Sequence, residues 1–168
     1  LKMKLEFGTG SRFALLKDKN AFRLIDYAIE NGIFRFDTAV SYGNGKTQPL
    51  LGRGLEKHFY ENREKFIISS KAGSHNLNLI RQTKNFVPYY IEQMINKSIK
   101  DLRCKYLDKF YLHGPSILEI ETSGLLNKLK ILQNQGKIKE IGVNTHEIEI
   151  MKLLASGYYS EINCLMID

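Results

Sequence analysis

The sequence is poor in cysteine and has no long apolar run. Its two cysteines, Cys104 and Cys164, lie far apart without a Cys-x-x-Cys or Cys/His spacing, which argues against a disulfide framework and against a structural zinc site. No apolar run approaches the roughly 18 residues that a membrane span needs, and the first residues lead into a short strand rather than a secretory signal. We therefore expect a soluble cytoplasmic protein that binds neither a metal nor a membrane.

Dense basic blocks are also missing, although the 168 residues carry a net charge of +7. The lysines and arginines are scattered along the chain, which favours a solvated surface over a nucleic-acid partner and leaves a phosphorylated small ligand as the alternative. A hydrophobic fraction of 43% and a charged fraction of 26% are typical of globular proteins. Residues 1–168 are numerous enough to bury a core as a single domain.

Strand signals and helix signals alternate along the chain. The expected strands cover residues 4–7, 33–37, 66–71, 107–113, 138–143 and 162–167. Between them apolar residues recur at helical spacing. Asp18 is suited to cap the first helix and Asn31-Gly32 to end it, while Pro49 and Pro88 suit first helical turns. Such an alternation predicts right-handed crossovers and a parallel sheet.

Two architectures have this pattern, an open doubly wound sheet and a (β/α)8 barrel. The dinucleotide fingerprint of the open sheet is missing, because residues 8–13 are Gly-Thr-Gly-Ser-Arg-Phe. Asp37, Lys71 and His113 end the second, third and fourth expected strands, at the edge where a barrel builds its active site. Each has a structural interpretation by itself, but their recurrence on consecutive strands favours the barrel.

The chemistry of these side chains suits proton donation to a carbonyl oxygen. A buried strand-end acid such as Asp37 needs a cation, and Lys71 can supply it. Tyr42 lies in the loop just beyond Asp37, and a nearby ammonium stabilises phenolate and so makes a phenol a better acid. His113 could hydrogen-bond the substrate oxygen as charge develops there. A cofactor must supply the hydride, since no side chain does.

Several short motifs together resemble the aldo-keto reductases over essentially the whole chain. They are Phe-Asp-Thr-Ala at 36–39, Ser-Tyr-Gly at 41–43, Leu-Gly-Arg-Gly-Leu at 51–55, Ile-Ser-Ser-Lys at 68–71, Tyr-Leu-His at 111–113 and Ile-Gly-Val at 141–143. The resemblance implies a TIM-type (β/α)8 barrel that reduces small aldehydes or ketones with NADPH and without a metal. It makes Asp37, Tyr42, Lys71 and His113 a catalytic tetrad with Tyr42 as the general acid.

The resemblance also implies contacts with NADPH or NADP. These would involve Thr9, Gly10, Asp37, Asn144 and Thr145. The chain departs from the family pattern at Asn144-Thr145, where Ser-Asn is common, and at Met166, where a glutamine is usual. Retention of the tetrad favours a reductase, whereas the departures favour the alternative, a non-catalytic barrel that senses cofactor or binds a partner.

The length of the chain predicts that it holds about six of the eight β/α units of a barrel. Residues 1–168 would then be a single barrel domain that is incomplete at its C-terminus, with two open sheet edges and exposed apolar surface. Three explanations stay open: a fragment of a longer enzyme, which the non-initiator Leu1 favours, a partner chain that completes the barrel, or a different pairing of the strands. We expect the isolated chain to oligomerise or to bind NADPH poorly.

Substrate walls in such barrels come from the loops at the carboxyl edge, and residues 73–87 form the one long loop expected here. Its polar side chains could line a pocket or form a solvated surface. They are His75, Asn76, Asn78, Arg81 and Lys84.

Overall fold

The computed structural model describes residues 4–73 and 83–167, and these form five β/α units followed by a sixth strand. His75, Asn76, Asn78 and Arg81 of the expected substrate loop lie outside the described residues. The strands are β1 (Phe7–Gly8), β2 (Arg35–Asp37), β3 (Ile67–Ala72), β4 (Leu107–His113), β5 (Ile138–Asn144) and β6 (Cys164–Met166). They form one sheet in the order β1-β2-β3-β4-β5-β6, and every neighbouring pair is parallel. The predicted parallel β/α alternation is confirmed, with β1, β2 and β6 shorter than expected.

Helices connect the strands. The α-helices are α1 (Asp18–Glu30), α2 (Thr47–Asn62), α3 (Pro88–Asp101), α4 (Ile117–Ile120), α5 (Leu125–Asn134) and α6 (Ile148–Ala155). Short 3-10 turns are η1 (Arg12–Leu15), η2 (Tyr42–Gly45), η3 (Arg63–Lys65) and η4 (Thr83–Phe86). Within the described ranges, no helix is both long and apolar enough to cross a membrane.

The helix boundaries correct one prediction and add one helix. Asp18 is the first residue of α1 and not its cap; Lys17 holds the cap position without a side-chain hydrogen bond. The unexpected helix α4 begins with a capping box, in which the Ser116 hydroxyl accepts from Glu119 N and the Glu119 carboxylate accepts from Ser116 N. A four-residue helix is too short to show a periodic apolar pattern, so only the capping-box residues could have predicted it from the sequence.

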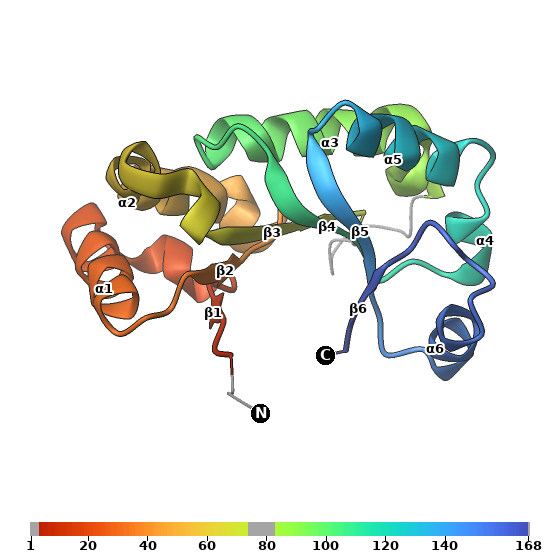
Figure 1. Cartoon of the computed structure of the whole chain (residues 1–168), viewed down its shortest axis with the longest axis horizontal. Helices are drawn as coiled ribbons and strands as arrows, with labels where there is room; N and C mark the ends of the chain where they lie inside the picture. The colour runs from red at the N-terminus through yellow and green to blue at the C-terminus, as the bar shows by residue number, and fades with distance from the viewer. Residues whose placement is uncertain (1–3, 74–82, 168) are drawn as a thin grey trace.

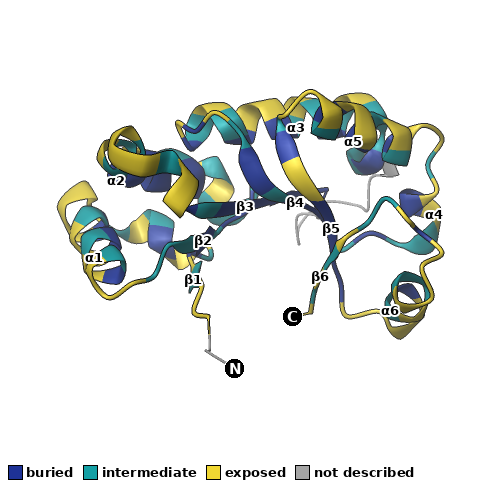
Figure 2. Ribbon diagram, viewed as in Figure 1, coloured by how far each residue is buried: buried dark blue, intermediate teal, exposed yellow. Residues whose placement is uncertain are grey.

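The sheet curves like an arch, with α1, α2, α3 and α5 on its outer side (Figure 1). Side chains such as Phe36, Ile68 and Phe110 fill the layer between strands and helices and are fully buried. Figure 2 shows that β3 and β4 are largely buried and that the helices are exposed on their outer faces. Because neighbouring residues of a strand point to opposite faces, Lys71 and Lys109 lie on the inner face.

A charged cluster ties three strands together near their amino ends. The carboxylate of Asp108 in β4 accepts hydrogen bonds from Arg63 Nη2 at 2.8 Å and from the backbone N of Ile68 at 3.0 Å. Its other oxygen lies 3.1 Å from Lys139 Nζ. The ring of Tyr106 lies 4.2 Å from the guanidinium carbon of Arg63 and 4.2 Å from Lys139 Nζ. The cluster, called here the Asp108 clasp, joins η3, β3, β4 and β5.

Candidate active site

The carboxyl ends of β2, β3 and β4 bring three predicted residues to one edge of the sheet. Asp37 is the last residue of β2 and pairs in register with Ser69. Lys71 lies two residues further along β3, in register with Tyr111, and His113 ends β4 in register with Asn144. Residues at alternate positions share a face, so all three side chains start from the inner face of the arch.

Asp37 and Lys71 form an ion pair in which Lys71 Nζ donates to Asp37 Oδ2. The Lys71 side chain is 1% exposed and that of Asp37 is 14% exposed. A lysine buried this deeply stays charged only when a counter-ion compensates for its lost hydration. Lys71 is therefore the cation that the strand-end acid was expected to need.

Tyr42 reaches this pair from η2. Its ring centroid lies 5.3 Å from Lys71 Nζ and 6.0 Å from the His113 ring, which it meets edge to face at 84°. The turn that follows requires left-handed backbone at Gly43, where φ is 58° and a Cβ would lie 2.3 Å from Ala14 Cβ. All four residues of the predicted tetrad thus lie together at one edge of the sheet.

The predicted cofactor contacts flank the tetrad on two sides. Thr9 and Gly10 follow β1, and the Thr9 hydroxyl donates to the backbone oxygen of Asp37 at 3.1 Å. Asn144 and Thr145 at the end of β5 are 1% and 2% exposed. Asn144 Nδ2 donates to the backbone oxygen of Met166 at 3.5 Å, which joins β5 to the edge strand β6.

The match to a known protein family extends over almost the whole chain. The sequence model of the Aldo/keto reductase family matches residues 4–166. The chain belongs to this family. The six parallel strands of this aldo/keto reductase chain and their helices form part of a TIM-type (β/α)8 barrel, which confirms the predicted fold class.

Relatives of this aldo/keto reductase chain are considerably longer. The chain is 28% identical over 145 residues to Aldo-keto reductase YhdN of Bacillus subtilis. This match covers 84% of the chain and 42% of that protein. The chain is 31% identical over 139 residues to D-arabinose 1-dehydrogenase of Saccharomyces cerevisiae. This match covers 79% of the chain and 38% of that protein. A solved aldo-keto reductase of Bacillus halodurans in its holo form has a TM-score of 0.79 at 23% identity, over 98% of this chain and 53% of that one. The chain spans 42% or less of the length of these two curated relatives.

Tyr111 is a neighbour of the tetrad, and the sequence reasoning quoted it in the Tyr-Leu-His motif without giving it a role in the site. It is 4% exposed, and it lies beside Lys71 in register on the inner face of the aldo/keto reductase sheet. A side chain at Gly142 would collide with its ring at 2.4 Å, so the glycine makes room for it. Burial raises the pKa of this phenol, and nearby acidic groups including Glu6 and Asp37 add to the rise. Counting back by two from His113 along β4 would have found it.

Both cysteines of the aldo/keto reductase chain are expected to react slowly with alkylating reagents. Burial raises the pKa of Cys164 to about 11, and the Glu140 carboxylate, 2.7 Å from Sγ, contributes. Burial likewise raises the pKa of Cys104 to about 11. The thiolate is the reactive form, so at pH 8 about one thiol in 1,000 is ionised, and the rate should rise about tenfold per pH unit up to pH 10.

Iodoacetamide labelling of a Cys104→Ser variant followed by mass spectrometry measures this rate for Cys164 alone. Glu140→Gln removes the acidic neighbour and should speed labelling of Cys164 at pH 8. Labelling at the rate of free cysteine in the Cys104→Ser variant would contradict the prediction.

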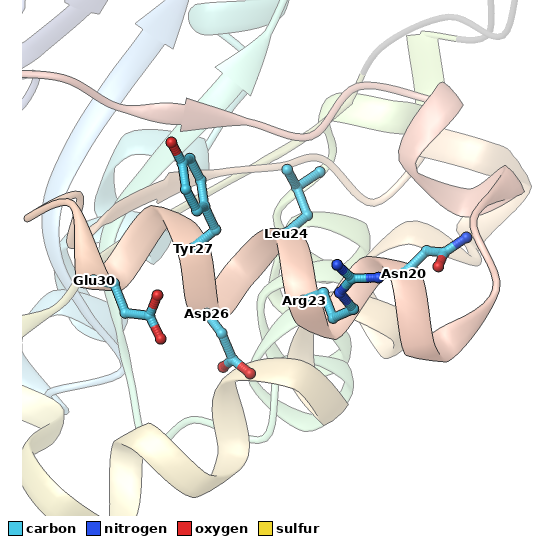
Figure 3. A pocket seen from close by; sticks show the side chains of 6 residues that line it. All are labelled: Asn20, Arg23, Leu24, Asp26, Tyr27 and Glu30. Atoms are coloured by element: carbon cyan, nitrogen blue, oxygen red, sulfur yellow. The ribbon is translucent and has the colours of Figure 1, made fainter.

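A hollow of about 550 Å³ on the outer surface belongs to a single helix and lies apart from the tetrad residues. Its lining side chains all come from α1 (Figure 3): Asn20, Arg23, Leu24, Asp26, Tyr27 and Glu30. Leu24 is 40% exposed and Tyr27 is 66% exposed, so the hollow is an open depression on the helix surface.

Proposed function

We propose that this chain carries the proton-donating centre of an NADPH-dependent carbonyl reductase, which converts an aldehyde or ketone to an alcohol. The observation that supports this function best is the buried Asp37–Lys71 ion pair beside the Tyr42 ring. A structural ion pair by itself would need no phenol next to it. An ammonium beside a phenol is what proton donation at neutral pH requires.

In this proposal each tetrad residue has one task. Tyr42 gives its hydroxyl proton to the carbonyl oxygen. The Lys71 ammonium, 5.3 Å from the Tyr42 ring centroid, stabilises the phenolate that remains. Asp37 holds Lys71 charged and oriented through their hydrogen bond. His113 donates a hydrogen bond to the substrate oxygen as negative charge develops there.

A nicotinamide cofactor supplies the hydride when it is bound. The residues at the carboxyl edge suit such a group, because the Asn144 amide is buried beside His113 in register and offers both a donor and an acceptor for a carboxamide. Thr9, Gly10, Asp37 and Thr145 would complete the contacts. Thr9 and Thr145 are, like Asn144, buried polar residues at this edge.

A second candidate is a non-catalytic barrel that senses cofactor or binds a partner. It is favoured by the hydrogen bond from the Asn144 amide to the backbone of Met166, which engages one of the donors that would hold the cofactor. The two functions differ in whether bound cofactor is consumed.

The test uses the native polypeptide that carries this sequence, mixed with NADPH and benzaldehyde. A reductase should oxidise NADPH and form an equal amount of benzyl alcohol, and deuterium from the C4 position of labelled NADPH should appear in the product. Binding of NADPH, seen as a change in protein fluorescence, without any alcohol formed would support the sensor and refute the reductase.

A further inference from the structure

Behind the candidate active site, three polar side chains are buried between the sheet and its helices. Gln48 of α2 is 1% exposed, and Ser70 of β3 and Ser98 of α3 are both 0% exposed. Gln48 Nε2 donates to Ser70 Oγ at 2.7 Å, and the two serine hydroxyls are 2.9 Å apart. The three side chains thus link α2 through β3 to α3.

Stability alone does not account for this set. The Gln48 amide oxygen is buried and has no hydrogen-bond partner among the described residues. A buried polar atom without a partner costs about 1–3 kcal/mol, and an apolar side chain of similar size avoids that cost. The glutamine therefore occupies a position where methionine or leucine would pack at lower cost.

The location of the link suggests its role. Ser70 immediately precedes Lys71, and it points to the helices while Lys71 points to the inner face. Gln48 lies in the first turn of α2, directly after the turn η2 that carries Tyr42. Backbone hydrogen bonds also join the chain between β2 and η2 to β3: Thr38 N donates to the Ser69 oxygen at 3.1 Å and Val40 N donates to the Lys71 oxygen at 2.9 Å. The hydrogen bond from Gln48 therefore anchors the far end of the Tyr42 segment to the strand that carries Lys71.

We propose that Gln48 and Ser70 are positioning residues, which hold the Tyr42 ring in place relative to the Lys71 ammonium. The inference rests on the proposed function for its effect on turnover, but the placement of Tyr42 is a separate property. A misplaced proton donor is costly, since an error of about 1 Å can lower a rate by about 100-fold.

The test compares Gln48→Met and Ser70→Ala with a matched control, Ser98→Ala. The control removes one hydroxyl from the same buried set and leaves the bond between α2 and β3 intact. Tyrosine labelled with ¹³C at Cζ reports on Tyr42 by NMR, with its resonance assigned through its loss in Tyr42→Phe. Cofactor affinity, kcat and thermal unfolding are measured for each variant.

Gln48→Met and Ser70→Ala should both shift the Tyr42 resonance and lower kcat about tenfold, with cofactor affinity nearly unchanged. Ser98→Ala should leave the resonance and kcat near their native values, even if it lowers the unfolding temperature as much. An unmoved Tyr42 resonance in folded Gln48→Met, or an equal shift in Ser98→Ala, would refute the positioning role. If neither the native protein nor any variant turns over substrate, the proposed function fails. The NMR comparison of the Tyr42 resonance still decides the positioning role in that case.

Discussion

Tyr42→Phe is expected to lower kcat for carbonyl reduction by about 100-fold to 10,000-fold, the range that a positioned general acid contributes. The change removes one hydroxyl and keeps the ring, so the edge-to-face contact with His113 at 6.0 Å can persist. Without the hydroxyl, the oxygen that gains negative charge in the transition state has no proton donor beside Lys71. Stopped-flow or steady-state loss of NADPH absorbance with an aldehyde measures the effect.

Cofactor binding separates a chemical effect from a structural one. Tyr42→Phe should bind NADPH with nearly native affinity, because the predicted cofactor contacts are Thr9, Gly10, Asp37, Asn144 and Thr145. Tyr60→Phe is the matched control, since Tyr60 is 85% exposed and lies on the outer helix α2. Activity within a few-fold of native in Tyr42→Phe would remove Tyr42 from the role of the acid.

The largest effect on stability is expected from Asp108→Ala, which should lower the free energy of unfolding by about 3 kcal/mol. The side chains of Asp108 and Arg63 are 11% and 10% exposed, so the substitution leaves a guanidinium in a largely dry site. It also removes the acceptor for the backbone N of Ile68 in β3. Breaking a buried pair from one side costs more than the pair contributes, because the remaining charge has lost its hydration.

Urea unfolding followed by circular dichroism measures this loss. The matched control is Glu149→Ala, which breaks an ion pair with Lys152 whose two side chains are both 68% exposed. Exposed pairs contribute little to stability, so this variant should unfold close to the native midpoint. Equal losses in the two variants would show that the Asp108 clasp behaves like an ordinary surface pair.

Sequence reasoning identified residues whose positions follow from the local pattern of a single strand or turn. Asp37, Lys71 and His113 each end an apolar run, and parallel strands joined by helices bring their carboxyl ends to one edge. Their meeting therefore follows from local patterns alone. Tyr42 was identified by its place in the loop just beyond Asp37, but its approach to Lys71 depends on a turn with left-handed backbone at Gly43.

The residues to which sequence reasoning gave no role in the site owe their contacts to strand register and to the packing of helices on the sheet. Tyr111 becomes a neighbour of Lys71 through the register between β3 and β4, and a shift by one residue would turn it to the other face. Ser70 is one of two adjacent serines in β3, and the local sequence does not indicate that Ser70, rather than Ser69, bonds to the helices. Its bonds to Gln48 and Ser98 arise from the rotation of α2 and α3 against the sheet.

The sequence by itself determined the order of strands and helices and the edge where the acid, the lysine and the imidazole meet. This was possible because the period of apolar residues sets each element, and chain connectivity sets the direction of parallel strands. Only the tertiary structure decided that the Tyr42 ring lies 5.3 Å from Lys71 Nζ and that Gln48 bonds Ser70 behind them. Those contacts depend on register and helix rotation, which are decided when the whole core packs and not by any one segment.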